Sequence, residues 1–353
     1  MSLTNSMISV KTPFNLIASK SQCFIDLNPP ESWRLIQRKN FTNLKILADF
    51  LALNFEQRKQ LLDKPTFAIN VPYRLAQKMT KGSLEDPLVK QFLPFKSEFE
   101  NHDLFVQDPV GDEQCRRTAQ LLHKYRGRVL LVCTSACAMH CRYCFRQNFS
   151  YQSHDKTFFK ELDLIRQDSS IHEVILSGGD PLSLSNDILA KLFEELNGIS
   201  HLKRIRFHTR FPIGIPERID KGFLNIIENC PKQIFFVIHC NHPLELDKDI
   251  FERLKALHLR GCVLLNQSVL LKGVNDRIEV LEELCELLSD HGIIPYYLHQ
   301  LDRVKGASHF ELGEKEGAAL IQELSKRLSG YAIPRYVREI AGEAHKTPIQ
   351  LLF

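Results

Sequence analysis

Three closely spaced cysteines carry the strongest chemical signal in this chain. Cys137, Cys141 and Cys144 offer three thiolates from one short loop, and the nearest other cysteine, Cys133, belongs to the strand expected at residues 129–133. A structural zinc site and an ordinary four-iron cluster both take four protein ligands, so a triplet indicates a [4Fe-4S] cluster with one iron open to another molecule. A zinc knuckle completed by His140, or three unrelated buried thiols, is the alternative interpretation.

The pattern along the chain predicts the elements that position this loop. From about residue 126, short β-branched runs alternate with amphipathic stretches, which is typical of a parallel α/β fold. We expect strands at residues 129–133, 173–176, 204–207, 234–238, 262–265 and 294–298. Six such units fit an open, partial (β/α)6 barrel. The predicted division is a helical amino-terminal region, residues 1–122, and a barrel, residues 123–353.

Polar residues follow the expected strands, and in a parallel barrel such positions converge on one mouth. Beyond the cysteine loop they include Gly178, Gly179, Asp180, His239, Asn266, Gln267 and Asp302. Together they predict a large polar pocket beside the cysteines. The paired glycines would let the backbone approach a ligand closely, although a plain tight turn would also explain them.

The composition is that of an ordinary globular enzyme. The chain has 353 residues, of which 44% are hydrophobic and 25% charged. A net charge of +4, with the basic residues dispersed, does not predict nucleic-acid binding. No apolar run approaches the roughly 20 residues of a membrane span, and no signal core follows Met1. We therefore expect a cytoplasmic protein with reduced thiols, without a membrane partner; its oligomeric state has no signal here.

The triplet, with Tyr143 before its last cysteine, resembles the signature of the radical S-adenosylmethionine (SAM) enzymes. The resemblance implies that SAM chelates the open iron and that an electron from the cluster cleaves it. The resulting 5'-deoxyadenosyl radical would abstract hydrogen from an unactivated carbon. A reductant protein such as a flavodoxin or ferredoxin would supply the electron. Gly178 and Gly179 would contact the methionine part of SAM, with Asp180 beside them.

Three further segments, residues 123–129, 266–276 and 342–348, resemble the lysine 2,3-aminomutase family. This radical SAM group also uses pyridoxal 5'-phosphate (PLP). The resemblance implies that Lys346 forms the Schiff base with PLP, a role that needs a primary amine. The other cofactor-binding residues it implies are Lys124, Tyr125 and Arg128 near the phosphate, and His239, Asn266 and Gln267 near SAM or PLP.

A lysine substrate needs a cation for its carboxylate and acidic groups for its distal ammonium. Arg146 matches the family's carboxylate-binding arginine, and its planar fork suits that pairing. Asp302 matches one of the two acidic residues that hold the ammonium. Glu339 takes the place of the second, where the metabolic enzymes carry aspartate; a surface ion-pair partner is the alternative for Glu339. The nearest rivals are arginine and glutamate aminomutases, and the two carboxylates would repel glutamate.

The segment before Lys346 departs from the metabolic enzymes. Residues 342–345 replace a run of glycines, and the residues after Lys346 do not include the cysteine-bearing tail of that branch. With residues 301–306, these traits are most similar to the branch that makes (R)-β-lysine for translation elongation factor P. This similarity implies a functional link to that factor and to its lysyl-transfer ligase.

Two alternatives belong to other functional classes. One is a radical SAM RNA-modifying enzyme without PLP, in which Lys346 would be a bystander. The other is a non-catalytic iron-sulfur regulatory protein.

Overall fold

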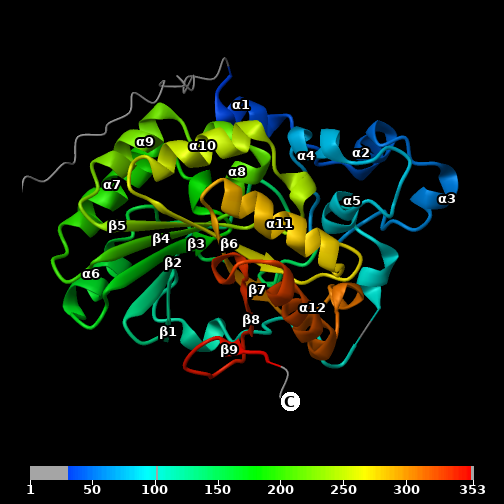
Figure 1. Cartoon of the computed structure of the whole chain (residues 1–353). Helices are drawn as coiled ribbons and strands as arrows, with labels where there is room; N and C mark the ends of the chain where they lie inside the picture. The colour runs from blue at the N-terminus through cyan, green and yellow to red at the C-terminus, as the bar shows by residue number, and fades with distance from the viewer. Residues whose placement is uncertain (1–30, 101, 351–353) are drawn as a thin grey trace, which may run out of the picture.

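A single open sheet organises the chain. The computed structural model describes residues 31–100 and 102–350, and its described part contains a nine-stranded sheet in the order β1 to β9 (Figure 1). The strands β2 to β8 run parallel, whereas β1 and β9 pair antiparallel at the two edges. Their bounds are β1 Leu121–Tyr125, β2 Arg128–Thr134, β3 Glu173–Gly178, β4 Arg204–Thr209, β5 Gln233–Ile238, β6 Val263–Val269, β7 Ile294–His299, β8 Arg335–Arg338 and β9 Thr347–Pro348.

Helices follow the parallel strands and cover the outer face of the sheet (Figure 1). They are α6 Phe159–Gln167, α7 Asn186–Asn197, α8 Phe211–Gly214, α9 Lys221–Glu228, α10 Lys248–His258, α11 Ile278–Asp290 and α12 Glu314–Arg327. None of the helices in the described ranges is long and apolar enough to cross a membrane.

The partial radical SAM barrel expected from the sequence is confirmed, and all six predicted strands form. Three further strands were not predicted. In β8 two arginines, one exposed and one half-exposed, flank only two buried residues; β9 has two residues, and β1 ends in polar residues. Such short or polar segments carry no β-strand pattern of their own and depend on the neighbouring strand.

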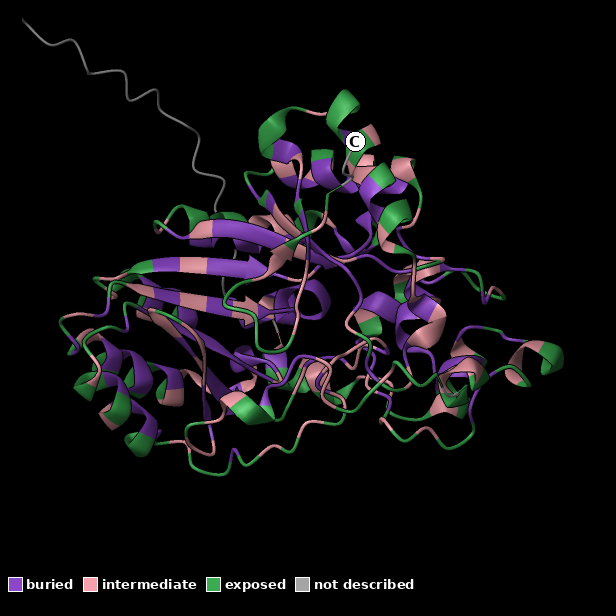
Figure 2. Cartoon of the chain, turned by 90° about the horizontal axis from the view of Figure 1, so that it is seen from below, coloured by how far each residue is buried: buried purple, intermediate pink, exposed green. Residues whose placement is uncertain are grey.

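Each helix buries one face against the sheet, as α7 illustrates. The Ser185 side chain caps its first turn by accepting a hydrogen bond from the Ile188 backbone N–H. Its buried residues recur at helical spacing, namely Leu189, Leu192, Phe193 and Leu196. Figure 2 shows the same arrangement throughout, with largely buried strands and helices that are exposed on their outward faces.

Five short helices form the amino-terminal region. They are α1 Trp33–Arg38, α2 Leu44–Phe50, α3 Phe55–Arg58, α4 Tyr73–Lys78 and α5 Pro87–Phe92. Their buried residues belong to the same hydrophobic core as the barrel, and the Trp33 ring lies edge-on to Phe211 with centroids 5.4 Å apart. The helical prediction holds for residues 31–100; residues 1–30 lie outside the described part. The predicted boundary near residue 122 stays a prediction.

Candidate active site

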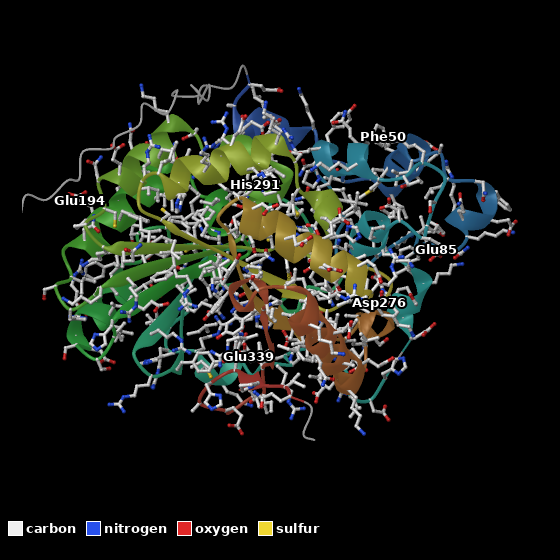
Figure 3. The ribbon with its side chains drawn as sticks, in the orientation of Figure 1. Phe50, Glu85, Glu194, Asp276, His291 and Glu339 are labelled. Atoms are coloured by element: carbon white, nitrogen blue, oxygen red, sulfur yellow. The ribbon has the colours of Figure 1, made fainter. Side chains whose placement is uncertain are left out.

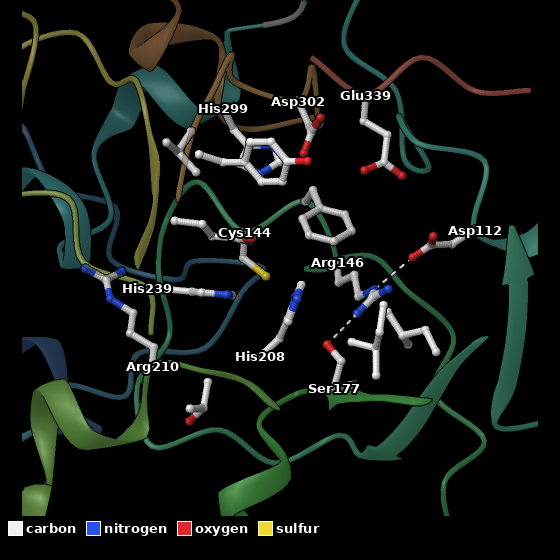
Figure 4. A pocket seen from close by; sticks show the side chains of 18 of the residues that line it. Asp112, Cys144, Arg146, Ser177, His208, Arg210, His239, His299, Asp302 and Glu339 are labelled. Atoms are coloured by element: carbon white, nitrogen blue, oxygen red, sulfur yellow. Dashed lines mark hydrogen bonds and ion pairs between the residues drawn. The ribbon is translucent and has the colours of Figure 1, made fainter. Parts of the chain in front are cut away.

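A cavity of about 600 Å³ lies where the parallel strands end and collects the predicted site residues (Figure 4). The loops after β2, β3, β5 and β7 contribute to its wall, together with β1 and the segment around β9. Fifteen of the sixteen predicted residues line it: Lys124, Tyr125, Arg128, Cys137, Cys141, Cys144, Arg146, Gly178, Gly179, Asp180, His239, Gln267, Asp302, Glu339 and Lys346.

The amino-terminal helices hold the cysteine loop in place. The side-chain amides of Gln37 and Asn70 donate hydrogen bonds to the carbonyl oxygen of Cys137, at 3.3 and 3.1 Å. Asn40 donates to the carbonyl oxygen of Ala138 at 2.8 Å. The backbone of this loop is therefore fixed from outside the barrel, a positioning role that the sequence did not predict.

The three thiols face the cavity, and all nine cysteines of the described ranges are free. Burial raises the pKa of Cys137 well above its usual range and that of Cys144 to about 11. The thiols of Cys137 and Cys144 therefore carry protons until metal binding displaces them. Three thiols on one cavity wall fit a [4Fe-4S] cluster with one open iron.

His140 lies within the cysteine triplet in sequence but turns away from it in space. Its Nδ1 atom lies 2.8 Å from the carbonyl oxygen of Ala68, and its ring stacks on Phe67 with centroids 4.8 Å apart. The position of this side chain does not support a zinc knuckle. No three His, Cys, Asp or Glu side chains in the described ranges are grouped to hold one metal ion. The cysteines of a four-iron cluster each bind a different iron.

Gly178 and Gly179 let two backbone segments approach each other. Gly178 has a φ of +124°, and a Cβ there would lie 2.6 Å from the carbonyl oxygen of Thr134. A Cβ at Gly179 would overlap the carbonyl oxygen of Ala136. The glycines therefore allow the end of β3 to pack against the start of the cysteine loop. Their contact with SAM stays a prediction.

Asp180 joins the ends of β3 and β4. Its carboxylate accepts hydrogen bonds from the Thr209 hydroxyl at 2.8 Å, the Arg210 backbone N–H at 2.8 Å and the Leu182 backbone N–H at 3.0 Å. Burial raises the pKa of Asp180 to about 6, and these hydrogen bonds oppose the rise. The carboxylate thus holds the strand ends in place, and its predicted contact with SAM stays a prediction.

Asn266 is the one predicted site residue that does not line the cavity. Its side chain accepts a hydrogen bond from the backbone N–H of Cys240 at 3.0 Å and donates to the carbonyl oxygen of Cys240 at 3.1 Å. Successive side chains of a strand point to opposite faces, so the neighbouring Gln267 faces the cavity instead. Asn266 thus ties β6 to the end of β5, and its predicted cofactor contact stays a prediction.

Five charged residues form a continuous chain of ion pairs along the cavity wall. Arg146 pairs with Asp112 at 2.8 Å, and Lys124 pairs with the other oxygen of Asp112 at 3.1 Å. Glu339 pairs with Lys124 and with Lys346, at 2.6 Å each. Figure 3 labels Glu339 in the lower centre of the view, whereas Glu194 and Glu85 lie toward its left and right sides.

Glu339 is not the surface residue of the alternative interpretation. Its side chain is only 14% exposed. Burial raises the pKa of Glu339, but the ammonium groups of Lys346 and Lys124 lower it further, to well below its usual range. Glu339 is therefore ionised and bound to both lysines in this state, and its predicted contact with a substrate ammonium stays a prediction.

The residues around Lys346 fit PLP. The Lys346 amine faces the cavity, and the Arg128 guanidinium stacks over the Tyr125 ring at 4.5 Å. Arg128 makes no ion pair with any other described residue, so its charge is available to a phosphate. Lys124 differs, because it already donates to Asp112, Glu339 and, at 2.8 Å, the carbonyl oxygen of Val110. A phosphate would reach Lys124 only by displacing one of these partners.

Asp302 presents an unpaired carboxylate to the cavity. No side chain or backbone group in the described part of the chain donates a hydrogen bond to it (Figure 4). Burial raises the pKa of Asp302 to about 7; the nearby Glu339 adds to the rise, and Lys346 and Lys124 oppose it. The site therefore contains a buried carboxyl group whose ionised form a bound cation would stabilise.

Comparison with known proteins agrees with this geometry. Residues 126–213 match the family model of a 4Fe-4S single cluster domain. The chain is 40% identical over 323 residues to the L-lysine 2,3-aminomutase of Haemophilus influenzae, covering 90% of this chain and 95% of that protein. It is also 40% identical over 306 residues to the Escherichia coli protein of the same name, covering 85% and 89%. The protein belongs to the lysine 2,3-aminomutase family.

A more distant member of the lysine 2,3-aminomutase family also matches along most of its length. The L-lysine 2,3-aminomutase of Clostridium subterminale is 31% identical over 343 residues, which cover 95% of this chain and 82% of that protein. As a member of this family, the protein is an isomerase of the radical SAM type with an iron-sulfur cluster. The regulatory and RNA-modifying alternatives do not fit this membership.

Sequence reasoning assigned no individual role to four polar residues of this aminomutase site: Asp112, His208, Arg210 and His299. Three histidine Nε2 atoms, of His208, His239 and His299, are buried without a partner in the described part of the chain. Burial lowers the pKa of His208 and His299 well below the usual range, so both are neutral. Buried polar atoms are normally hydrogen-bonded, which indicates that bound ligands satisfy these imidazoles. The positions of His208 and His299 at strand ends were the available signal.

Proposed function

We propose that this protein converts L-lysine to β-lysine by moving the α-amino group to C3. One observation carries the proposal. A single cavity brings together three cysteines suited to a cluster, the Lys346 amine, the Arg146 guanidinium and the unpaired Asp302 carboxylate. These are the groups that an aminomutase needs for SAM, PLP and a substrate with opposite charges at its two ends. The printed names of the relatives support the same substrate.

The cofactors supply the difficult chemistry when bound, SAM with the cluster providing a carbon-centred radical and PLP a carrier for the migrating nitrogen. The protein's own residues hold these groups. The cysteine loop binds iron, Lys346 offers its amine to PLP, and Arg128 and Tyr125 lie where a phosphate would be bound. Phe67, from the amino-terminal region, lines the cavity and helps to exclude water from a radical reaction.

Arg146 and Asp302 explain the choice of a lysine substrate. The Nε and Nη1 atoms of Arg146 donate to Asp112 at 2.8 Å and to Ser177 at 3.2 Å, which fixes the plane of the guanidinium. Its Nη2 atom makes no hydrogen bond within the described ranges and is available to the substrate carboxylate. Asp302, which lies above Arg146 in Figure 4, is available to the distal ammonium.

Lysine binding is expected to strengthen as the pH rises toward 7, because burial raises the pKa of Asp302 to about 7. Below that pH, binding of the distal ammonium must release the Asp302 proton, so affinity falls by about tenfold per pH unit. Calorimetric titration of the cofactor-loaded protein with L-lysine measures this slope. Asp302→Asn should lose it, which separates Asp302 from the amines of lysine itself; equal slopes for both proteins would contradict the assignment.

Asp302→Asn should also cripple turnover while leaving slow, uncoupled cleavage of SAM intact. An ammonium left unpaired in an enclosed site costs roughly 3 to 5 kcal/mol, or about two to four decades in kcat/KM for lysine. Asp290→Asn, at an exposed position on α11, is the matched control and should leave kcat/KM unchanged. An unchanged kcat/KM in Asp302→Asn would show that the ammonium is held elsewhere.

One anaerobic assay tests the proposed function. The protein is reconstituted with iron, sulfide, PLP and SAM, reduced, and supplied with free L-lysine, L-arginine or L-glutamate. We expect β-lysine as the product, resolved by chiral chromatography, and no turnover of glutamate. Rapid turnover of arginine with none of lysine would replace the substrate, and SAM cleavage without an amino-shifted product from any of the three amino acids would refute the aminomutase reaction.

The biological role that we propose is supply of (R)-β-lysine for attachment to elongation factor P by its lysyl-transfer ligase. Three departures from the metabolic enzymes support this branch: Glu339 in place of aspartate, residues 342–345 in place of glycines, and residues 301–306. A coupled reaction of the protein, ligase and elongation factor P tests it, with mass spectrometry as the readout. We expect β-lysine on the factor in preference to α-lysine; indifference of the ligase to the product would contradict this role.

A further inference from the structure

A buried arginine outside the predicted site touches one of the three cluster cysteines. Arg210 directly follows β4, and its Nη1 atom donates a hydrogen bond to the Cys141 Sγ atom at 2.7 Å. Within the described ranges, no arginine or lysine side chain donates a hydrogen bond to the sulfur of Cys137 or Cys144. The three ligands are therefore electrostatically unequal.

A network of buried polar groups fixes the Arg210 side chain against Cys141. Its Nη2 atom donates to the Glu245 carboxylate at 2.6 Å and to the Gln91 side-chain oxygen at 2.8 Å. Its Nη1 atom also donates to the Tyr143 hydroxyl, and the guanidinium lies 4.9 Å from the centre of the Phe92 ring. Glu245 is fully buried. With both terminal nitrogens engaged, the guanidinium cannot turn away from the sulfur without breaking several hydrogen bonds.

Arg210 keeps its charge in this environment. A guanidinium stays protonated in proteins, and the buried Glu245 carboxylate pairs with it at 2.6 Å. Glu245 offsets the charge of Arg210 in this buried place, and the same guanidinium donates to the Cys141 sulfur.

We propose that Arg210 raises the reduction potential of the cluster through its hydrogen bond to Cys141. The inference rests on the cluster of the proposed function. One-electron reduction by a flavodoxin or ferredoxin adds negative charge to the cluster and its sulfur ligands. A charged donor at one ligand sulfur stabilises the reduced form, and hydrogen bonds to cluster sulfurs are an established determinant of potential. Arg210 is thus a positioning residue that eases electron entry.

Two variants test the proposal. Arg210→Gln combined with Glu245→Gln removes both members of the buried ion pair, so no carboxylate is left unpaired in the interior. Arg210→Lys keeps the charge but lacks the fork that reaches Cys141, Glu245 and Gln91 together. The midpoint potential is measured without SAM, by redox titration followed by electron paramagnetic resonance. Iron content and thermal unfolding show which samples are folded and loaded.

We expect the double variant to weaken cluster reduction at least tenfold, a fall of about 59 mV in midpoint potential. The fall should be smaller for Arg210→Lys. Arg218→Lys is the matched control, because this fully buried arginine donates to the carbonyl oxygens of Leu182 and Leu184 and does not line the cavity. Its potential should equal that of the unaltered protein.

The outcomes separate this inference from the proposed function. If the unaltered protein assembles no four-iron cluster, the proposed function fails. If the cluster assembles, an unchanged potential in either iron-loaded variant contradicts the role of Arg210 and leaves the proposed function untouched. An unchanged potential together with weakened binding of SAM would make Arg210 a SAM-binding residue instead.

Discussion

Replacing Lys346 with alanine is expected to abolish aminomutase activity and the visible absorbance of bound PLP, while the iron content stays unchanged. A Schiff base needs a primary amine, and only one other lysine, Lys124, lines the described cavity. Lys124 is saturated by Val110, Asp112 and Glu339 and offers no free amine. The cluster should persist because its ligands lie on the separate loop after β2.

Borohydride trapping gives this prediction a direct readout. Reduction followed by peptide mapping should find PLP on Lys346 in the unaltered protein and no labelled peptide in Lys346→Ala. Lys124→Arg is the matched control, since it keeps the positive charge beside Asp112 and Glu339 but removes the second amine. Labelling of a different lysine in the unaltered protein would show that the cofactor assignment is wrong.

Cys141→Ala is expected to lose most of the bound iron and all cleavage of SAM, and the same holds for Cys137 and Cys144. Two remaining thiolates cannot replace the three that the open-iron cluster requires. Cys285→Ala is the control, because Cys285 packs with Leu281 and Leu298 in a separate part of the core. Its loss leaves a small cavity at a cost of about 1 kcal/mol and should spare both cofactors.

Iron analysis and anaerobic SAM cleavage measure this second effect. PLP should still be trapped on Lys346 in Cys141→Ala, which shows that the variant is folded. A full four-iron signal with undiminished SAM cleavage in Cys141→Ala would remove the cysteine loop from the mechanism.

The features that the sequence predicted are those with local signals. Runs of β-branched residues predict the long strands β2 to β7, and the cysteine motif lies within eight consecutive residues. Lys346 has no such signal of its own and was found through family resemblance. Asn266 and Gln267 were predicted together, but adjacent residues of a strand face opposite sides, and only Gln267 lines the cavity.

The polar networks of the site had no local signal. Lys124 and Glu339 are 215 positions apart in the chain, and Arg210 and Gln91 are 119 apart. Such pairs form only when the completed fold brings distant elements together, and they leave no periodicity in either segment. Asp112 and Arg210 were missed for this reason.

The pairing of Glu339 with two lysines has a consequence for how the protein opens. Lys124 belongs to the edge strand β1, and Lys346 directly precedes β9 at the other edge of the sheet. In a closed barrel, backbone hydrogen bonds would join the two edge strands. Here the Glu339 carboxylate, next to β8, links the β8–β9 edge to Lys124 of β1. Separating the two edges here breaks the Lys124–Glu339 ion pair and no strand pairing, and that cost falls as ionic strength rises. An anionic ligand that pairs with Lys124 and Lys346 therefore takes the place of Glu339 without breaking any strand pairing.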